Sequence, residues 1–398
     1  MQSLHCRYSI SRVTPGILRN RLRSALRVAE LGVEAALATA RSKLINARRE
    51  PRTPPRNPYV QNVSASSAVI AWVSEEPGVG IVEYGETPRL GREGVDARVA
   101  RRHVVVLSGL APGSTYYYQV AEADGVSEMA RFRTAPEGED SGFTFAVIGD
   151  SGRGRKDQLA VAALLERLKP DLILHTGDVV YPSGEERHYD RRFFVPYGRL
   201  LKEVPIFPVL GNHDLERGNG AAYLENFHSP RNDPRGTGRY YSFDWGNAHF
   251  VALSSELYHG DGSDSPEEQK AWLERDLKET RQPWKIVYFH RPIYSSSKHG
   301  SDEGIREDLE PVLIRHEVDL VFSGHDHAYE RTVPIRGVTY VVSGGGGKGL
   351  YPAGRSEWTA FSKSTHHALL VRIDGERLYL EAVEPDGAVI DRADLGRT

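Results

Sequence analysis

The chain has 398 residues but only one cysteine, Cys6, and two methionines. A single cysteine excludes any disulfide within the chain, so stability has to come from packing and from any bound metal. This cysteine usage fits a reducing compartment and is also compatible with an exported protein. No apolar run approaches the roughly 20 residues that a bilayer-spanning helix needs, so the sequence argues against a transmembrane protein.

A large excess of charge of either sign is also missing, because 51 Lys and Arg face 54 Asp and Glu. The distribution is nevertheless uneven, since residues 1–56 hold twelve Lys and Arg against three Glu. The rest of the chain is therefore acidic, which argues against general nucleic-acid binding. The basic segment would suit a membrane surface or a polyanion, and a solvated helix face is the alternative.

Residues 1–50 are predicted to form a basic, amphipathic helical leader. They lack the uninterrupted apolar stretch of a secretory signal, because Glu30 and Glu34 break its most apolar part. Apolar residues recur every three or four positions over roughly 16–48, which predicts a helix with an apolar stripe. A Pro-rich linker, 51–58, follows. We expect the stripe to pack on a domain or on a second copy of the chain, the latter giving a homodimer.

Residues 59–136 are predicted to form an antiparallel β-sandwich, because short β-rich runs alternate with turns at regular spacing. The predicted strands include 67–73, 80–84, 103–107 and 132–134. The turn at 110–114 leads to Tyr116 and resembles the tyrosine corner of fibronectin type III domains, with Trp72 in the place of their core tryptophan. We interpret these aromatic residues as core packing and not as a surface for a ligand.

The sequence pattern changes over residues 137–398, where continuous apolar runs alternate with segments of helical spacing. This pattern predicts a layered α/β domain. The predicted strands are 143–148, 172–174, 206–210, 248–253, 285–289, 320–322 and 338–342. Helices are predicted over 157–168 and after the capping box that starts at Ser265. Two further runs, 368–373 and 377–383, are expected to complete a sheet edge.

Five short polar blocks follow apolar runs in this second domain. They are Gly-Asp-Ser-Gly at 149–152, Gly-Asp-Val-Val-Tyr at 177–181, Gly-Asn-His-Asp at 211–214, Val-Tyr-Phe-His at 287–290 and Gly-His-Asp-His at 324–327. Sites in α/β sheets form beyond the carboxyl ends of strands, so these side chains are expected to converge at one rim. Asp, Asn, His and Tyr all bind metals, and two ions about 3.5–4 Å apart need a bridging carboxylate. The blocks therefore predict a two-metal site for phosphate ester hydrolysis.

In this order the blocks resemble the metallophosphoesterase (calcineurin-like) superfamily, and Tyr181, three residues after Asp178, narrows the resemblance to the purple acid phosphatases. The resemblance covers about residues 59–390. It implies a catalytic β-sandwich flanked by helices, preceded by the fibronectin III-like domain. The activity implied is hydrolysis of phosphomonoesters by in-line attack of a metal-bound hydroxide. Relatives are mostly exported, which suggests a secreted or periplasmic protein, although no signal is visible and a cytoplasmic location stays open.

The resemblance also implies a set of metal ligands. Those of the first metal would be Asp150, Asp178, Tyr181 and His327. Those of the second metal would be Asp178 as a bridge, Asn212, His290 and His325. A phenolate is a hard anionic donor, so the Tyr181 position suits Fe(III). The second ion would be Fe(II), Zn(II) or Mn(II).

Two further histidines are expected to be catalytic by the same resemblance. His213 would contact the phosphate, and His299 would bind the substrate or protonate the leaving group, a role that suits a side chain titrating near 6.5. Arg291 would either reach phosphate or serve packing. The glycine-rich run 344–349 lacks the Lys-Ser/Thr pair and the helix start of a phosphate loop, so we interpret it as a flexible loop at the rim.

Two other functions stay open at this point. Loops set the specificity of a shared scaffold, so the same site would also serve a phosphodiesterase or a nucleotide pyrophosphatase. A binding module with a vestigial catalytic domain is the alternative of another class, and the intact ligand set argues against it. If the protein is an enzyme of either kind, its expected partner is a small phosphate ester and not a nucleic acid.

Overall fold

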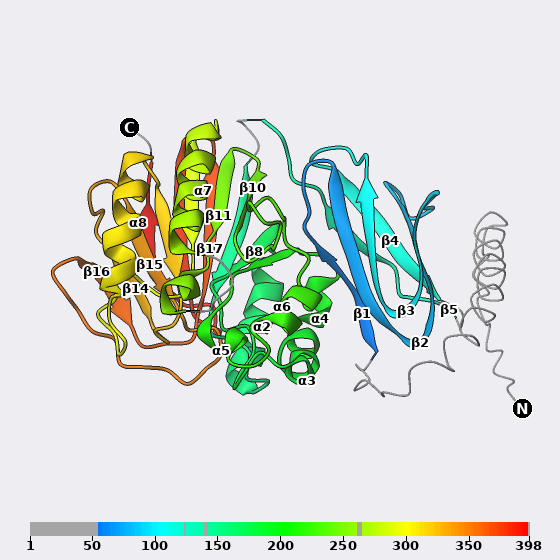
Figure 1. The fold of residues 1–398 in the computed structure, drawn as a ribbon, viewed down its shortest axis with the longest axis horizontal. Helices are drawn as coiled ribbons and strands as arrows, with labels where there is room; N and C mark the ends of the chain where they lie inside the picture. The colour runs from blue at the N-terminus through cyan, green and yellow to red at the C-terminus, as the bar shows by residue number, and fades with distance from the viewer. Residues whose placement is uncertain (1–54, 123–124, 139–141, 261–264, 397–398) are drawn as a thin grey trace, which may run out of the picture.

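The computed structural model describes residues 55–122, 125–138, 142–260 and 265–396. The predicted leader and most of the predicted linker lie outside the described residues. Figure 1 shows a smaller β domain beside a larger domain of sheets and helices. Among the described helices, none combines the length and apolar character that crossing a bilayer requires.

The first domain is a β-sandwich, as predicted, with antiparallel pairing throughout. Its strands are β1 (Arg56–Gln61), β2 (Ser67–Gly85), β3 (Arg92–Ser108), β4 (Thr115–Glu122), β5 (Gly125–Val126) and β6 (Ala130–Arg133). Strand β2 pairs with β1 along its first half and with β4 along its second half, so one strand serves both layers. The sequence predicted two strands here. They form one strand instead, because β2 stays paired with β3 across the polar residues between them, with register shifts around Gly78 and Gly80.

The core of this domain contains the aromatic residues that the sequence singled out. Trp72 and Tyr116 are both buried. The hydroxyl of Tyr116 accepts a hydrogen bond from the backbone N–H of Ala111 at 2.9 Å, as expected of a tyrosine corner. Its ring stacks on Phe132 with centroids 5.9 Å apart. These residues therefore fix the fold of the domain by packing.

The second domain is built on two sheets. The first has the order β19-β18-β17-β7-β8-β9 and the second the order β10-β11-β12-β13-β15-β14-β16. The strands of the first are β7 (Phe143–Ile148), β8 (Leu172–His175), β9 (Ile206–Pro208), β17 (Ala368–Asp374), β18 (Arg377–Val383) and β19 (Val389–Asp394). Those of the second are β10 (Tyr241–Trp245), β11 (Ala248–Ala252), β12 (Trp284–Tyr288), β13 (Leu320–Ser323), β14 (Tyr329–Thr332), β15 (Thr339–Ser343) and β16 (Thr359–Lys363).

Parallel strands form the centre of each sheet. Strands β7, β8 and β9 run parallel, and so do β11, β12, β13 and β15. The prediction that 368–373 lies at a sheet edge is wrong, because β17 pairs with both β7 and β18. The edge is formed by β19, whose polar sequence gave little strand signal.

The two sheets pack face to face, with helices on both outer faces (Figure 1). Phe145 of the first sheet meets Phe250 and Phe322 of the second edge-on, with ring centroids 5.2 and 6.1 Å apart. The helices along the first sheet include α2 (Lys156–Leu168), α3 (Glu186–Tyr189), η1 (Asp190–Phe194), α4 (Val195–Leu201), α5 (Asn212–Leu215) and α6 (Ala221–Asn226). The other sheet is covered by α7 (Pro266–Glu279) and α8 (Glu303–Arg315), with η2 (Ser255–His259) nearby. Ser265 caps α7 as predicted, since its side chain accepts from the N–H of Glu268 at 3.0 Å.

Arg56 joins the two domains at the start of β1, which lies three residues before the predicted domain start at residue 59. Its Nε donates to Asp190 at 2.9 Å, and a second nitrogen lies 3.3 Å from Glu186. The guanidinium also stacks on the ring of Phe194, 3.6 Å from the centroid. The buried arginine therefore anchors the first strand on the second domain.

Candidate metal centre

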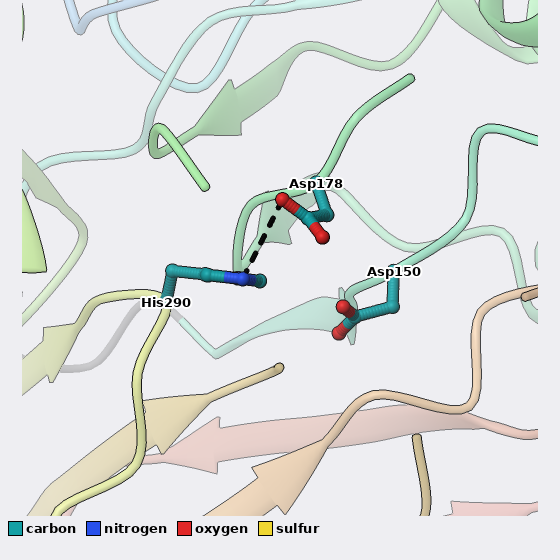
Figure 2. A group of neighbouring side chains, drawn as sticks. All are labelled: Asp150, Asp178 and His290. Carbon is teal, nitrogen blue, oxygen red and sulfur yellow. Dashed lines mark ion pairs between the residues drawn. The ribbon is translucent and has the colours of Figure 1, made fainter. Parts of the chain in front are cut away.

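All five sequence blocks end at one rim of the two sheets, as predicted. Asp150, Asp178 and Asn212 follow β7, β8 and β9 of the first sheet, while His290 and His325 follow β12 and β13 of the second. Figure 2 shows that Asp150, Asp178 and His290 point into a common space. Possible ligand atoms of these three buried side chains all lie within 4.8 Å of one another. The fold therefore gathers groups that are distant in the sequence.

The backbone at this rim is unusual at the functional residues themselves. Asp150, Asp178 and His325 have φ values of 55°, 54° and 65°, in the left-handed region that side chains other than glycine seldom adopt. Some of the preceding glycines are needed for close approach. A Cβ on Gly149 would lie 2.0 Å from a threonine oxygen, and one on Gly211 would lie 2.3 Å from the backbone nitrogen of Asp178. The ligand loops thus touch one another directly.

We call Asp150, Tyr181 and His327 the first half of the centre. The hydroxyl of Tyr181 lies 2.9 Å from Oδ1 of Asp150 and 3.2 Å from Nε2 of His327. Nδ1 of His327 is 2.7 Å from the carbonyl oxygen of Gly349. A carbonyl can only accept, so Nδ1 carries the proton and Nε2 presents a lone pair to the two oxygens.

Asn212, His290 and His325 form the second half. Nδ1 of His290 donates to the carbonyl of Thr176 at 2.9 Å. Burial lowers the pKa of His290, but the charges of Asp178 and Asp150 outweigh burial and raise it. Nε2 of His290 lies 3.2 Å from Oδ1 of Asn212, 3.2 Å from Nδ1 of His325 and 3.5 Å from Oδ1 of Asp178. Atoms that can bind a metal thus face one another across a short gap.

This arrangement fits a pair of cations. Buried carboxylates are paired or coordinate metals, yet within the described residues neither Asp150 nor Asp178 has a Lys or Arg in ion-pair contact. Burial raises the pKa of Tyr181, and the charges of Asp150 and Asp178 raise it further. The Tyr181 phenol in this setting keeps its proton unless a strong Lewis acid binds the oxygen and displaces that proton. The oxygen and nitrogen donors suit hard to borderline metal ions.

His213, which the sequence predicted to contact the phosphate, borders the centre. Its ring lies 4.6 Å from the ring of Tyr181, and its Nε2 lies 4.0 Å from Oδ2 of Asp178. Nδ1 is 2.7 Å from the carbonyl oxygen of Pro182 and 2.7 Å from a carboxylate oxygen of Glu216. Both partners are acceptors, so Nδ1 is protonated and Nε2 is turned toward the centre.

His299 lies on the other side, with its ring 4.3 Å from that of His325. Its backbone N–H donates to Oδ1 of Asp326 at 2.8 Å, and Oδ2 of Asp326 accepts from Ser295 at 2.5 Å. His299, Arg291 and His325 line a small cavity of about 150 Å³. Burial lowers the pKa of His299. The loop that carries this histidine is therefore fixed by a buried carboxylate next to the second half.

Arg291 lies beside the second half of the centre and pairs with a buried carboxylate. Its Nε and Nη2 donate to the two carboxylate oxygens of Glu256 at 2.8 and 3.1 Å. The remaining Nη1 lies 3.4 Å from Nε2 of His325. Arg291 is therefore occupied by Glu256 and lies against a candidate ligand.

Sequence reasoning missed other residues around the centre. Asp214 accepts from the N–H groups of Val179 and Gly211, and Asp326 holds the His299 loop. Asp214 and Asp326 both belong to the five polar blocks, so their place in the sequence could have identified them. Tyr351 stacks on His327 with centroids 4.0 Å apart, but it belongs to no block.

The glycine-rich run 344–349 is packed and not a free loop, so its interpretation as flexible is wrong. Residues 344–347 are buried. The N–H of Gly346 donates to the carbonyl of Gly149 at 2.9 Å, and that of Lys348 donates to the carbonyl of Asp150 at 2.9 Å. A Cβ on Gly346 would lie 2.2 Å from the Gly149 oxygen. Small residues are required here because the run lies directly on the Asp150 loop.

Comparisons with known proteins agree with this architecture. Residues 143–329 match the calcineurin-like phosphoesterase family, and residues 55–134 match the purple acid phosphatase N-terminal domain. Purple acid phosphatase 15 of Arabidopsis thaliana is 31% identical over 288 residues, which are 62% of this chain and 53% of that protein. Acid phosphatase type 7 of Danio rerio is 27% identical over 403 residues, covering 85% of this chain and 89% of that protein.

A solved structure shares the fold. Purple acid phosphatase PPD1 from yellow lupin (Lupinus luteus) seeds has a TM-score of 0.76 and 22% identity, covering 87% of this chain and 75% of that chain. The fold and the gathered metal-binding side chains define a calcineurin-like phosphoesterase with a dimetal fold. The chain thus combines a calcineurin-like phosphoesterase domain with a purple acid phosphatase N-terminal domain, and relatives named purple acid phosphatase are similar to it. The chain spans about half the length of the Arabidopsis relative.

Proposed function

We propose that this chain is an acid phosphatase that hydrolyses phosphomonoesters at a binuclear metal centre. The observation that carries the proposal is the convergence of buried Asp150, Asp178 and His290, whose carboxylates have no Lys or Arg in ion-pair contact among the described residues. The names of the relatives, purple acid phosphatase and acid phosphatase type 7, support the same activity.

The ligand assignment follows the two halves of the centre. Asp150, Tyr181 and His327 would hold the first metal, Asn212, His290 and His325 would hold the second, and Asp178 would be shared by both. The hard phenolate of Tyr181 favours Fe(III), and the mixed amide and imidazole donors of the second half accept Fe(II), Zn(II) or Mn(II). When bound, such ions lower the pKa of water and neutralise the charge of the phosphate.

The remaining residues bind the substrate and move protons. The acceptors around Nδ1 of His213 fix its ring with Nε2 toward the centre, where it contacts a phosphate oxygen. His299 is positioned by Asp326 at the cavity, where it can protonate the departing alcohol under acidic conditions. Tyr351 covers His327 and keeps bulk water from that side. Export and a homodimer, both expected from the sequence, stay predictions.

The experiment compares initial rates for an aryl phosphomonoester and its matching diester across acid to neutral pH. The proteins are the metal-loaded chain, Asp178→Asn, and Asp386→Asn as a control on an exposed turn. Monoester turnover should fall in Asp178→Asn by more than the about 10–100-fold that losing an outer partner of a ligand costs. The control should keep its rate.

Three results would contradict parts of the proposal. A diester hydrolysed faster than its monoester would point to a phosphodiesterase. No turnover of either substrate with both metal positions occupied would favour a binding module. Protein without iron and without a visible charge-transfer band would exclude Fe(III) on Tyr181.

A further inference from the structure

A buried histidine connects the two loops that carry Asp150 and Asp178. His175 is the last residue of β8, and both it and Ser151 are fully buried. Nδ1 of His175 accepts from the backbone N–H of Gly177 at 3.2 Å. Because that N–H can only donate, Nε2 of His175 carries the ring proton and donates it to Oγ of Ser151 at 2.8 Å. One imidazole therefore joins the residue after Asp150 to the residue before Asp178.

The two loops that His175 connects tend to move apart when no metal is bound. Their carboxylates, Asp150 and Asp178, point into one buried space (Figure 2) and have no Lys or Arg in ion-pair contact among the described residues. Like charges repel more strongly in a buried site than in water. Both residues also have left-handed backbone, which is locally unfavourable. A connection between the loops therefore opposes a real tendency to separate.

His175 makes this connection without adding a charge. Burial lowers the pKa of His175 to about 3, and the nearby charge of Asp150 offsets only part of the lowering. The ring is therefore neutral from moderately acid to neutral pH. An imidazolium in the same place would attract the Asp150 carboxylate and reduce the negative charge that is left for a metal. A neutral ring fixes the loops and leaves both carboxylates to the metal centre.

We propose that His175 is a positioning residue that, through Ser151 and Gly177, holds the two carboxylate loops in register for a metal pair before any metal binds. The inference rests on the proposed function, because it concerns the same binuclear centre. The loops are then ordered when the chain folds, and metal binding is not weakened by the need to order them. Loss of an outer partner of a metal site lowers metal affinity by about 10–100-fold, so removing this connection should weaken metal binding.

The β-sandwich domain offers a matched control. His103, on β3, is also buried, at 1% exposed, and its Nε2 lies 3.3 Å from Oγ of Ser74. This pair repeats the chemistry of His175 and Ser151 but belongs to the domain that holds none of the candidate metal ligands. Replacing His103 should therefore weaken the fold without changing the affinity for metal.

The test measures metal binding and not turnover. The metal-depleted chain is titrated with Mn(II) by calorimetry, and its Tm is measured with and without Mn(II). The variants are His175→Asn, whose shorter side chain cannot reach Ser151, Ser151→Ala, the two combined, and His103→Asn. Both single variants of the pair should bind Mn(II) about tenfold more weakly or worse, and the rise in Tm that Mn(II) produces should shrink accordingly. The combined variant should lose little more than the weaker-binding single variant, because both changes remove one connection.

His103→Asn should lower the Tm equally with and without Mn(II). The same pattern in His175→Asn and Ser151→Ala, with unchanged Mn(II) affinity, would overturn the inference, because His175 would then serve packing alone. If His175→Asn does not fold, the titration of Ser151→Ala decides. A chain that binds no Mn(II) would overturn both this inference and the proposed function. Mn(II) binding without hydrolysis of any phosphate ester would remove the proposed function alone, and the affinities would still decide the role of His175.

Discussion

The two halves of the candidate centre differ in how far they are enclosed. In the first half, Asp150, Tyr181 and His327 are 0%, 2% and 3% exposed. In the second half, Asn212 and His325 are partly exposed, and His325 borders the small cavity beside His299. The first half is therefore shut inside the protein, while the second half is open to solvent at Asn212 and His325, although its His290 is buried.

They also differ in what supports them. The first half is held by backbone contacts of the glycine-rich run and by the stacked ring of Tyr351. Support for His325 in the second half includes Arg291, which in turn depends on the carboxylate of Glu256. The comparison suggests that one half retains its metal and the other exchanges it.

The largest effect is expected from a chelator. Dialysis at moderate chelator concentration should empty the open second half first, because its ligands reach solvent. Activity would then disappear while the absorption band expected from Tyr181 remains. Metal analysis and the visible spectrum, followed in parallel with activity, check this order. Loss of the band before the activity would reverse the assignment of the two halves.

The second prediction separates the halves by mutation. Asp150→Asn should lower kcat/KM by more than about 100-fold, beyond the usual loss of an outer partner, and excess metal should not restore it. Asn212→Ala should lose activity at limiting metal and recover a large part at excess metal, since three donors of the second position remain. Rates titrated against Zn(II) or Mn(II) provide the measurement, with Asp386→Asn as the control. Equal recovery of activity by Asp150→Asn and Asn212→Ala at excess metal would show that the two halves do not differ in this respect.

A smaller effect is expected from the outer support of the second half. Glu256→Gln removes the charge that holds Arg291 beside His325, and outer partners of this kind change metal affinity by about 10–100-fold. The apparent affinity for the second metal should fall, while the Tyr181 band stays unchanged. Tyr351→Leu is the matched variant on the first half, and it should leave the second-metal affinity intact. A changed band in Glu256→Gln would show that the halves are not independent.

The smallest effect lies outside both halves, at His249. Its two ring nitrogens are 2.7 Å from Asp244 and 2.8 Å from Asp276. Burial lowers the pKa of His249, but the two carboxylates outweigh burial and raise it to about 9, above the unfolded value of about 6.5. The triad therefore stabilises the fold fully below about pH 6.5, and this contribution is lost as the pH rises through about 9.

The measurement is the Tm of the chain and of His249→Gln between pH 6 and 10. The unmodified chain should lose several degrees more than the variant over this range, and the metal content of both proteins should stay equal. Parallel Tm profiles would mean that the triad does not titrate in the folded state.

Much of the candidate site could be predicted from the sequence, because each ligand stands in a short block directly after a buried strand. Asp150 and His325 illustrate this, since a glycine next to an Asp or His beyond an apolar run marks the carboxyl end of a parallel strand. Lys348 and Tyr351 could not be found in this way. Each is a single residue beyond β15, and its place depends on how that segment packs on the Asp150 loop.

In the fold, too, some elements could be predicted from the sequence and others could not. Strand β7 could be predicted to the residue because it is a mostly apolar run bounded by Gly142 and Gly149. Strand β2 could not, since the polar interruption around Gly78 hides a strand that continues through shifts of register. The place of β17 within its sheet was also missed, because pairing with β7 joins segments more than two hundred residues apart.

The left-handed backbone at Asp150, Asp178 and His325 has a consequence for the history of such genes. A residue other than glycine in this conformation costs of the order of 1–3 kcal/mol, so selection for catalysis maintains three locally unfavourable choices. A duplicated copy released from that selection would gain stability by accepting glycine at these places. We therefore expect inactive descendants to lose these residues early while keeping the surrounding core, so that they remain well-folded proteins without a reaction.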